Sequence, residues 1–191
     1  MKINYKSFAL ALLLSAAVSP AMAENLYGAI DIGQTTGKDI CAGNPPSVSG
    51  CEDTATLYRF AIGYQFSPMW GAEASYANYG KASIGSLGGL SGDWEATGLQ
   101  ISGTGTFPIA DKFSIIGKLG IASTDLKVTT NFAGDASETT TKLAYGIGAQ
   151  YDFTENVSVR AQYEDFGTIG NDNTTGTTKF TLLSAGLALK F

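Results

Sequence analysis

The feature that most constrains this chain is an alternation of apolar and polar residues that recurs in eight segments. Each segment sets apolar side chains on one face against small or polar side chains on the other, which is the period of a β-strand with one apolar face. Phe60 and Ile62, for example, share a face opposite Arg59. The eight segments are residues 25–34, 56–66, 70–79, 94–107, 113–121, 143–153, 157–164 and 179–191. They predict an all-β chain.

The connections between these segments alternate between short and long. Three are tight turns, at residues 67–69, 108–111 and 154–156. The four polar links are longer, at residues 35–55, 80–93, 125–140 and 167–178. Short turns at one rim and long loops at the other are typical of outer-membrane barrels. The sequence therefore predicts an eight-stranded antiparallel up-and-down transmembrane β-barrel with both termini on the short-turn side.

A soluble barrel of the lipocalin kind, with its apolar faces turned inward, is the alternative. Three features argue against it. Charged residues stand in mid-strand among small residues, which suits the crowded lumen of an eight-stranded barrel. Aromatic residues on the apolar faces gather near the strand ends, as membrane-interface girdles do, and the chain ends in an aromatic residue. The girdle residues are Phe66, Trp70, Phe107, Phe113, Phe153 and Phe191 on the turn side, and Tyr58, Tyr76 and Tyr163 on the other.

The first 23 residues have the pattern of an export signal. Lys2 and Lys6 precede an apolar stretch at residues 8–18, and Ala21-Met22-Ala23 supplies a small-x-small cleavage site. The apolar stretch is shorter than the roughly 20 residues of a membrane-spanning helix, although a buried N-terminal helix is an alternative. We expect cleavage after Ala23, which assigns residues 1–23 to the signal peptide and 24–191 to the barrel domain.

Two cysteines, Cys41 and Cys51, lie in the first long link. An exported chain enters an oxidising compartment, where an even pair of cysteines indicates a disulfide. A pair of free surface thiols is the alternative. A metal site is disfavoured because two thiolates are too few ligands.

Composition excludes several function classes. The chain has no histidine, so imidazole-based nucleophile activation and imidazole metal sites are absent, and we expect no enzyme activity, no metal and no cofactor. A net charge of −5 disfavours nucleic acid as a partner. The run Asn171-Asp172-Asn173 lacks the glycine and the downstream acid of a calcium loop.

Three stretches around the short turns carry a family resemblance. GYQFSPMWGAEASYANYG (63–80), GTFPIADKFSIIGKLG (105–120) and GAQYDFTENVSVRAQYEDFG (148–167) resemble the transmembrane domain of the outer-membrane protein A (OmpA) group. In length the chain is similar to the small barrel-only proteins of the OmpX kind. The resemblance implies a bacterial outer-membrane location. It also implies that terminal Phe191, with in-phase Leu189 and Leu187, is the signal for the barrel-assembly machinery. Outer-membrane lipids and lipopolysaccharide are the other expected partners.

The polar faces predict a charged pair inside the barrel. In a closed barrel of eight, the third and seventh segments are opposed, and Glu73 and Arg160 each lie three residues from the start of a strand at the short-turn rim. We expect their side chains to meet, with Thr104 and Gln150 in the same layer. The family resemblance implies that Glu73 and Arg160 match a central gating salt bridge and that Lys118 matches a basic lumen position. Thr104 and Gln150 depart from the second charge pair of that family. Polar groups that simply plug the barrel are the alternative to a gated conduit.

Three functions are compatible with such a barrel. The first is a structural or interaction protein that displays four long loops of unknown ligand and supports the envelope. The second is a narrow pore of low conductance, since eight strands leave an interior mostly filled by side chains. The third, an enzyme acting on lipid A, is disfavoured by the missing histidine.

Overall fold

The computed structural model describes residues 25–38, 50–87, 90–131, 134–171 and 176–191. The predicted signal peptide, Cys41 and most of the run 171–173 lie outside these residues. The eight strands are β1 (Leu26–Lys38), β2 (Thr54–Gln65), β3 (Trp70–Leu87), β4 (Leu90–Ala110), β5 (Phe113–Thr130), β6 (Gly134–Asp152), β7 (Val157–Asn171) and β8 (Gly176–Lys190). Among the described residues, no helix is long and apolar enough to cross a membrane.

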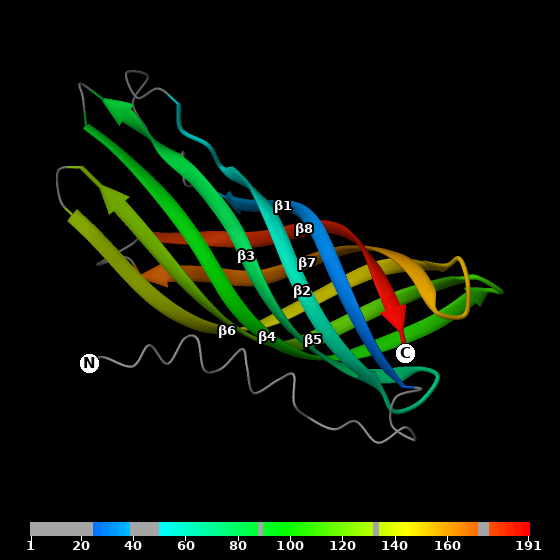
Figure 1. The fold of residues 1–191 in the computed structure, drawn as a ribbon. Helices are drawn as coiled ribbons and strands as arrows, with labels where there is room; N and C mark the ends of the chain where they lie inside the picture. The colour runs from blue at the N-terminus through cyan, green and yellow to red at the C-terminus, as the bar shows by residue number, and fades with distance from the viewer. Residues whose placement is uncertain (1–24, 39–49, 88–89, 132–133, 172–175) are drawn as a thin grey trace, which may run out of the picture.

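The strands form one closed barrel in which each pairs with its sequence neighbours. All neighbouring pairs are antiparallel, and β1 closes the barrel against β8, from Tyr27 opposite Lys190 to Lys38 opposite Lys179. The short turns and the C-terminus lie at the same end (Figure 1). The predicted eight-stranded antiparallel barrel is therefore confirmed.

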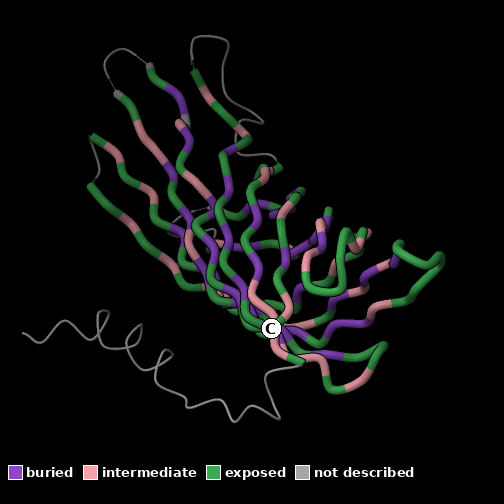
Figure 2. The backbone as a smooth tube through the Cα atoms, turned by 45° about the vertical axis from the view of Figure 1, so that its right-hand side comes forward, coloured by how far each residue is buried: buried purple, intermediate pink, exposed green. Residues whose placement is uncertain are grey.

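The apolar faces point outward, so the soluble alternative is wrong. Phe60 and Ile101 are 64% and 71% exposed, whereas Arg59, between Tyr58 and Phe60, is 1% exposed. Buried and exposed residues alternate along the strands (Figure 2). All nine predicted girdle aromatics are exposed. Since a continuous apolar band of this kind is compatible with hydrocarbon and not with water, the barrel spans a membrane with this band.

Three of the four long links are mostly strand, which corrects the prediction of long loops. Residues 80–87 and 90–93 belong to the β3–β4 hairpin, residues 125–130 and 134–140 to the β5–β6 hairpin, and residues 167–171 and 176–178 to the β7–β8 hairpin. The reason is that the alternation changes phase along a strand. In β5, Ile121 faces outward and is 59% exposed, whereas further along Leu126 is 4% exposed and its neighbours Asp125 and Lys127 are outside. Beyond the apolar band the outer face therefore meets water, and the apolar residues turn inward.

The strands do not all extend equally beyond the band. Pairing between β2 and β3 stops at Tyr58 opposite Asn78, and pairing between β6 and β7 stops at Tyr145 opposite Asp165. Above these points β3, β4, β5 and β6 continue together, over residues 79–87, 90–98, 123–130 and 134–144, as a protruding sheet (Figure 1). Because short turns mark the periplasmic end of such barrels, the protruding sheet lies on the extracellular side.

Candidate functional site

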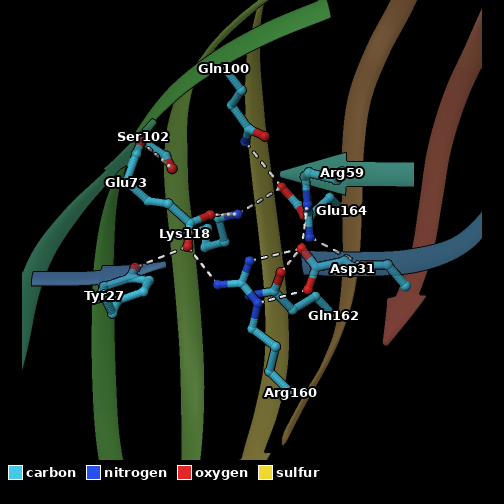
Figure 3. Close-up of polar contacts among 11 residues, drawn as sticks. Tyr27, Asp31, Arg59, Glu73, Gln100, Ser102, Lys118, Arg160, Gln162 and Glu164 are labelled. Carbon is cyan, nitrogen blue, oxygen red and sulfur yellow. Dashed lines mark hydrogen bonds and ion pairs between the residues drawn. The ribbon is translucent and has the colours of Figure 1, made fainter. Parts of the chain in front are cut away.

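Six charged side chains meet in the lumen and form a closed ring of alternating sign (Figure 3). They come from β1, β2, β3, β5 and β7, and the side chains are at most 3% exposed. In order around the ring they are Lys118, Glu73, Arg160, Asp31, Arg59 and Glu164. Three acids and three bases give this ion-pair ring a net charge of zero.

Arg160 joins the two halves of the ring. Its Nη1 lies 2.5 Å from Oε2 of Glu73, and its Nε and Nη2 each donate to a different carboxylate oxygen of Asp31 at 2.8 Å. A guanidinium that binds one carboxylate through two parallel hydrogen bonds is fixed in orientation as well as position. Arg160 is therefore held by two acids from different strands.

Glu73 has two further partners. Lys118 Nζ lies 2.8 Å from its Oε1, and the hydroxyl of Tyr27 donates to its Oε2 at 2.9 Å. Lys118 also lies 3.5 Å from Oε2 of Glu164, which continues the ring. Both carboxylate oxygens of Glu73 are thus satisfied, as a buried charge requires.

Arg59 completes the ring between Asp31 and Glu164. Its Nε donates to Asp31 Oδ2 at 2.8 Å, and its Nη1 pairs with Glu164. Its Nη2 donates to Gln162 Oε1 at 2.6 Å and to Ser184 Oγ at 3.2 Å, while Gln100 Nε2 donates to Glu164 Oε2 at 3.0 Å. The chain contains two arginines, and both lie in the ring.

The structure brings Glu73, Arg160 and Lys118 together, but sequence reasoning missed Asp31, Arg59 and Glu164. A signal for the first two existed, since both are charged residues on the lumen face in mid-strand, and they lie directly opposite each other in the β1–β2 register. Finding that pairing required the register across the long link 35–55, which the alternation alone leaves open.

Thr104 and Gln150 lie in the layer expected for them, opposite Lys118 and Arg160 in the strand register. Their side chains line a cavity on the periplasmic side of the ring, and Gln150 Nε2 donates to Asp152 Oδ1 at 2.8 Å. The cavity measures about 520 Å³, and Glu73 and Arg160 lie on its lining. Two buried atoms on its wall, Ser158 Oγ and Gln162 Nε2, have no hydrogen-bond partner among the described residues.

Glycines on the lumen face make room for the ring. A Cβ at Gly186 would lie 2.1 Å from the Ile30 carbonyl oxygen and 2.2 Å from Asp31 Oδ1. On β6, a Cβ at Gly146 would lie 2.5 Å from Glu164 Cγ. Such approaches are far inside van der Waals contact, so β6 and β8 accept the ring because they carry glycine at these positions.

An apolar layer that was not expected from the sequence fills the lumen on the extracellular side of the ring. Tyr79, Trp94, Phe166 and Phe180 are at most 2% exposed and form edge-to-face contacts, with the Tyr79 and Phe180 ring centroids 5.2 Å apart. Leu57, Leu126, Ile169 and Leu182 belong to the same cluster. Phe166 and Ile169 reach it because a bulge in β7 between Asp165 and Thr168, with Gly167 at a φ of 69°, shifts the register of the β7–β8 hairpin.

Within the described residues, no group of three or more His, Cys, Asp or Glu side chains could hold a metal ion. The arrangement of the ring is that of mutually neutralised charges rather than of a site with an open coordination position. Phe191, Leu189 and Leu187 lie on the outer face, each about half exposed or more.

A closed eight-stranded barrel with an outward apolar band and a paired polar lumen is a transmembrane barrel of the bacterial outer membrane. The chain belongs to the outer membrane protein beta-barrel domain family, whose model matches residues 8–191. The resemblance to the OmpA group and the outer-membrane location are thereby confirmed.

Curated relatives include outer membrane protein A of Shigella flexneri, 29% identical over 134 residues, which are 68% of this chain and 38% of that protein. The attachment invasion locus protein of Yersinia pseudotuberculosis is 30% identical over 104 residues, 53% of this chain and 56% of that protein. The chain thus spans less than half the length of the OmpA relatives it matches.

Solved structures share the fold. The N-terminal β-barrel domain of Pseudomonas aeruginosa OprF superposes with a TM-score of 0.58 at 16% identity, covering 88% of this chain and 98% of that one. Ail, the attachment invasion locus protein of Yersinia pestis, in complex with the heparin analogue sucrose octasulfate, has a TM-score of 0.55 at 19% identity, covering 87% and 99%.

The ring predicts strong coupling between Glu73 and Arg160. Arg160→Met leaves an uncompensated negative charge in the lumen and should lower the free energy of unfolding by about 3–5 kcal/mol. Glu73→Gln with Arg160→Met restores two acids and two bases and should recover much of that loss. Urea unfolding in lipid vesicles measures both. Lys81→Met, which breaks the exposed Lys81–Asp93 pair, is the matched control and should cost less than about 1 kcal/mol. Additive costs for Glu73 and Arg160 would mean that the two side chains act independently.

The close approach of β8 to Asp31 predicts a second effect on stability. Gly186→Ala should lower the free energy of unfolding by about 1–3 kcal/mol, because the new methyl group overlaps the Ile30 carbonyl and the Asp31 carboxylate. Gly117→Ala is the control, since nothing lies within 4 Å of a Cβ there, and it should be neutral or slightly stabilising. Equal effects of the two substitutions in urea unfolding would contradict this account of Gly186.

Proposed function

We propose that the protein is a sealed outer-membrane barrel that holds a rigid β-sheet outside the cell, where the sheet makes surface contacts and the barrel supports the envelope. The observation that carries the proposal is the division of the molecule into a membrane-spanning barrel and a sheet that extends beyond the membrane. Inside the apolar band the ion-pair ring spans the lumen above the periplasmic cavity, and beyond the band the strands continue as the protruding sheet.

Two layers in series support a sealed lumen. An ion that enters from the periplasmic side reaches the cavity and then meets the ring, whose charges are all paired. Behind the ring lies the apolar layer of Tyr79, Trp94, Phe166 and Phe180, which offers an ion no hydration. A narrow pore, the alternative from the sequence, would require both layers to rearrange.

The protruding sheet supports a role in surface contact. Strands hold their side chains in fixed positions, so a paired sheet presents a defined surface where long loops would present many conformations. The attachment invasion locus proteins among the relatives carry attachment in their name, and one was crystallised with a heparin analogue. We extend surface attachment to this chain as a proposal and leave its ligand open.

The expected partners follow from the two surfaces. The apolar band contacts lipid acyl chains, and the band lies next to the lipopolysaccharide leaflet at its extracellular edge. Phe191, with Leu189 and Leu187, serves the barrel-assembly machinery during insertion. The proposal includes neither nucleic acid as a partner nor an enzymatic reaction.

A sealed lumen predicts that the protein conducts no ions across a membrane. The wild-type protein in planar lipid bilayers should give no resolved single-channel steps. Arg160→Met should also remain silent, because the apolar layer still closes the lumen. Regular unitary steps from the wild-type protein would contradict the sealed barrel and favour the narrow pore.

The assignment of the two ends predicts labelling from outside the cell. With both native cysteines replaced by serine, Ser137→Cys on the exposed face of β6 should react with a membrane-impermeant maleimide on intact cells. Asp111→Cys, in the turn between β4 and β5, is the matched control and should react only after lysis. The opposite pattern would mean that the protruding sheet faces the periplasm.

A further inference from the structure

The cavity on the periplasmic side of the ring is large enough for a ligand. Its volume of about 520 Å³ lies within the range of about 300–1,000 Å³ that ligand pockets occupy. Its lining extends from Glu73 and Arg160 of the ring to Ser67 and Pro68 in the turn between β2 and β3. Because that turn lies at the short-turn end of the barrel, the cavity opens to the periplasm. A small molecule can therefore enter it without passing the ring.

The cavity wall carries two buried polar groups that have no partner. Gln162 is 3% exposed, and its Oε1 accepts a hydrogen bond from Arg59 Nη2 at 2.6 Å (Figure 3). Arginine only donates, so this bond fixes the orientation of the amide and leaves Nε2 as a donor without an acceptor among the described residues. Ser158, on the same face of β7, is 2% exposed, and its Oγ has no partner there either. Since buried polar groups are normally hydrogen-bonded, both groups indicate a polar occupant.

The charges of the lining favour an occupant that carries no net charge. Among the described residues, the lining contains two acids, Glu73 and Asp152, and two bases, Arg160 and Lys190. Glu73 and Arg160 are bound to each other in the ring, at the inner end of the cavity. Asp152 and Lys190 are the last residues of β6 and β8, at its mouth. A charged group deep in the cavity would thus find no free counter-charge, which makes its burial unfavourable.

The uncharged polar groups of the lining suit a ligand rich in hydroxyl groups. The hydroxyls of Tyr27, Thr104, Thr106 and Ser114 line the cavity together with Ser158 and Gln162. A hydroxyl both donates and accepts hydrogen bonds, so it matches another hydroxyl in either role. An acyl chain would leave these groups unsatisfied. The four residues from Ser158 to Gln162 span roughly 13 Å of strand, which is about the length of two linked sugar rings.

We propose that the periplasmic cavity binds a neutral sugar of about two rings, which accepts a hydrogen bond from Gln162 Nε2 and exchanges one with Ser158 Oγ. The site lies at the opposite end of the barrel from the protruding sheet and does not depend on surface contact. It gives the sealed barrel a second, periplasmic function, the retention of a saccharide below the ring.

The test uses the full-length protein in lipid nanodiscs, with lactose as the probe and nuclear magnetic resonance of side-chain amides as the readout. Lactose should shift the Gln162 amide signal to saturation, with a Kd in the millimolar range. The Gln100 amide is the internal control and should not shift, because it donates to Glu164 in the ring and is not on the cavity lining. Lactobionate, which carries a carboxylate, should bind at least about tenfold more weakly, because its charge has no free counter-charge inside.

Ser158→Ala tests the wall directly. It removes a hydroxyl that bonds to none of the described residues, so the fold should be unaffected, and the Kd for lactose should rise by about three- to tenfold, as expected for one hydrogen bond. Ser75→Ala is the matched control, since Ser75 is also a buried serine of the barrel lumen but is not on the cavity lining, and its Kd should equal that of the wild type.

Three results would overturn the proposal. A Gln162 signal that does not move, or that moves linearly together with Gln100, would show that the cavity holds no sugar. An unchanged Kd in Ser158→Ala would place the binding elsewhere. Tighter binding of lactobionate, or of glycylglycine, whose two charges suit Asp152 and Lys190, would assign the cavity to a charged ligand instead.

Discussion

The constraint on which this structure depends is that side chains fill the middle of an eight-stranded barrel, so that a charge buried there must be neutralised by another side chain. The ion-pair ring meets this requirement with three acids and three bases that alternate around a closed path. Because each member contacts two of opposite sign, the five contributing strands are tied across the lumen as well as along the wall. The glycines at 146 and 186 are a consequence, since the ring needs space that a methyl group would occupy.

The second organising feature is that the apolar residues change from the outer to the inner face of the strands where the strands leave the membrane. Within the apolar band the large apolar residues face lipid and the lumen is polar. Beyond it Leu126 and its cluster face inward and the charged residues face water. One strand therefore has a segment whose outer face contacts lipid and a segment whose outer face contacts water. The apolar layer that results closes the barrel just outside the ring. The inner face of the protruding sheet contributes Tyr79, Trp94 and Leu126 to this layer.

The sequence predicted the barrel well because its membrane part repeats one simple pattern, apolar outside and polar inside, eight times. The meeting of Glu73 and Arg160 could also be predicted, because it follows from the number of strands and from the similar depth of the two residues on opposed strands. Asp31 and Arg59 were missed because their meeting depends on the β1–β2 register across a long link. The protruding hairpins were interpreted as loops because their outer faces are polar and rich in threonine. In addition, the apolar residues change from the outer to the inner face partway along each strand, so the pattern does not indicate one continuous strand. The disulfide between Cys41 and Cys51 stays a prediction.

The measurement that tests the ion-pair ring most directly is solid-state nuclear magnetic resonance of the protein in lipid bilayers with labelled arginine and carboxyl side chains. Both arginines of the chain, Arg59 and Arg160, belong to the ring, so the arginine signals report on it alone. The ring predicts through-space contacts from the Arg160 guanidinium to the carboxyl carbons of both Asp31 and Glu73, with slow exchange of its Nε proton. A guanidinium that contacts neither carboxyl group and exchanges its protons as fast as a solvated arginine would contradict it.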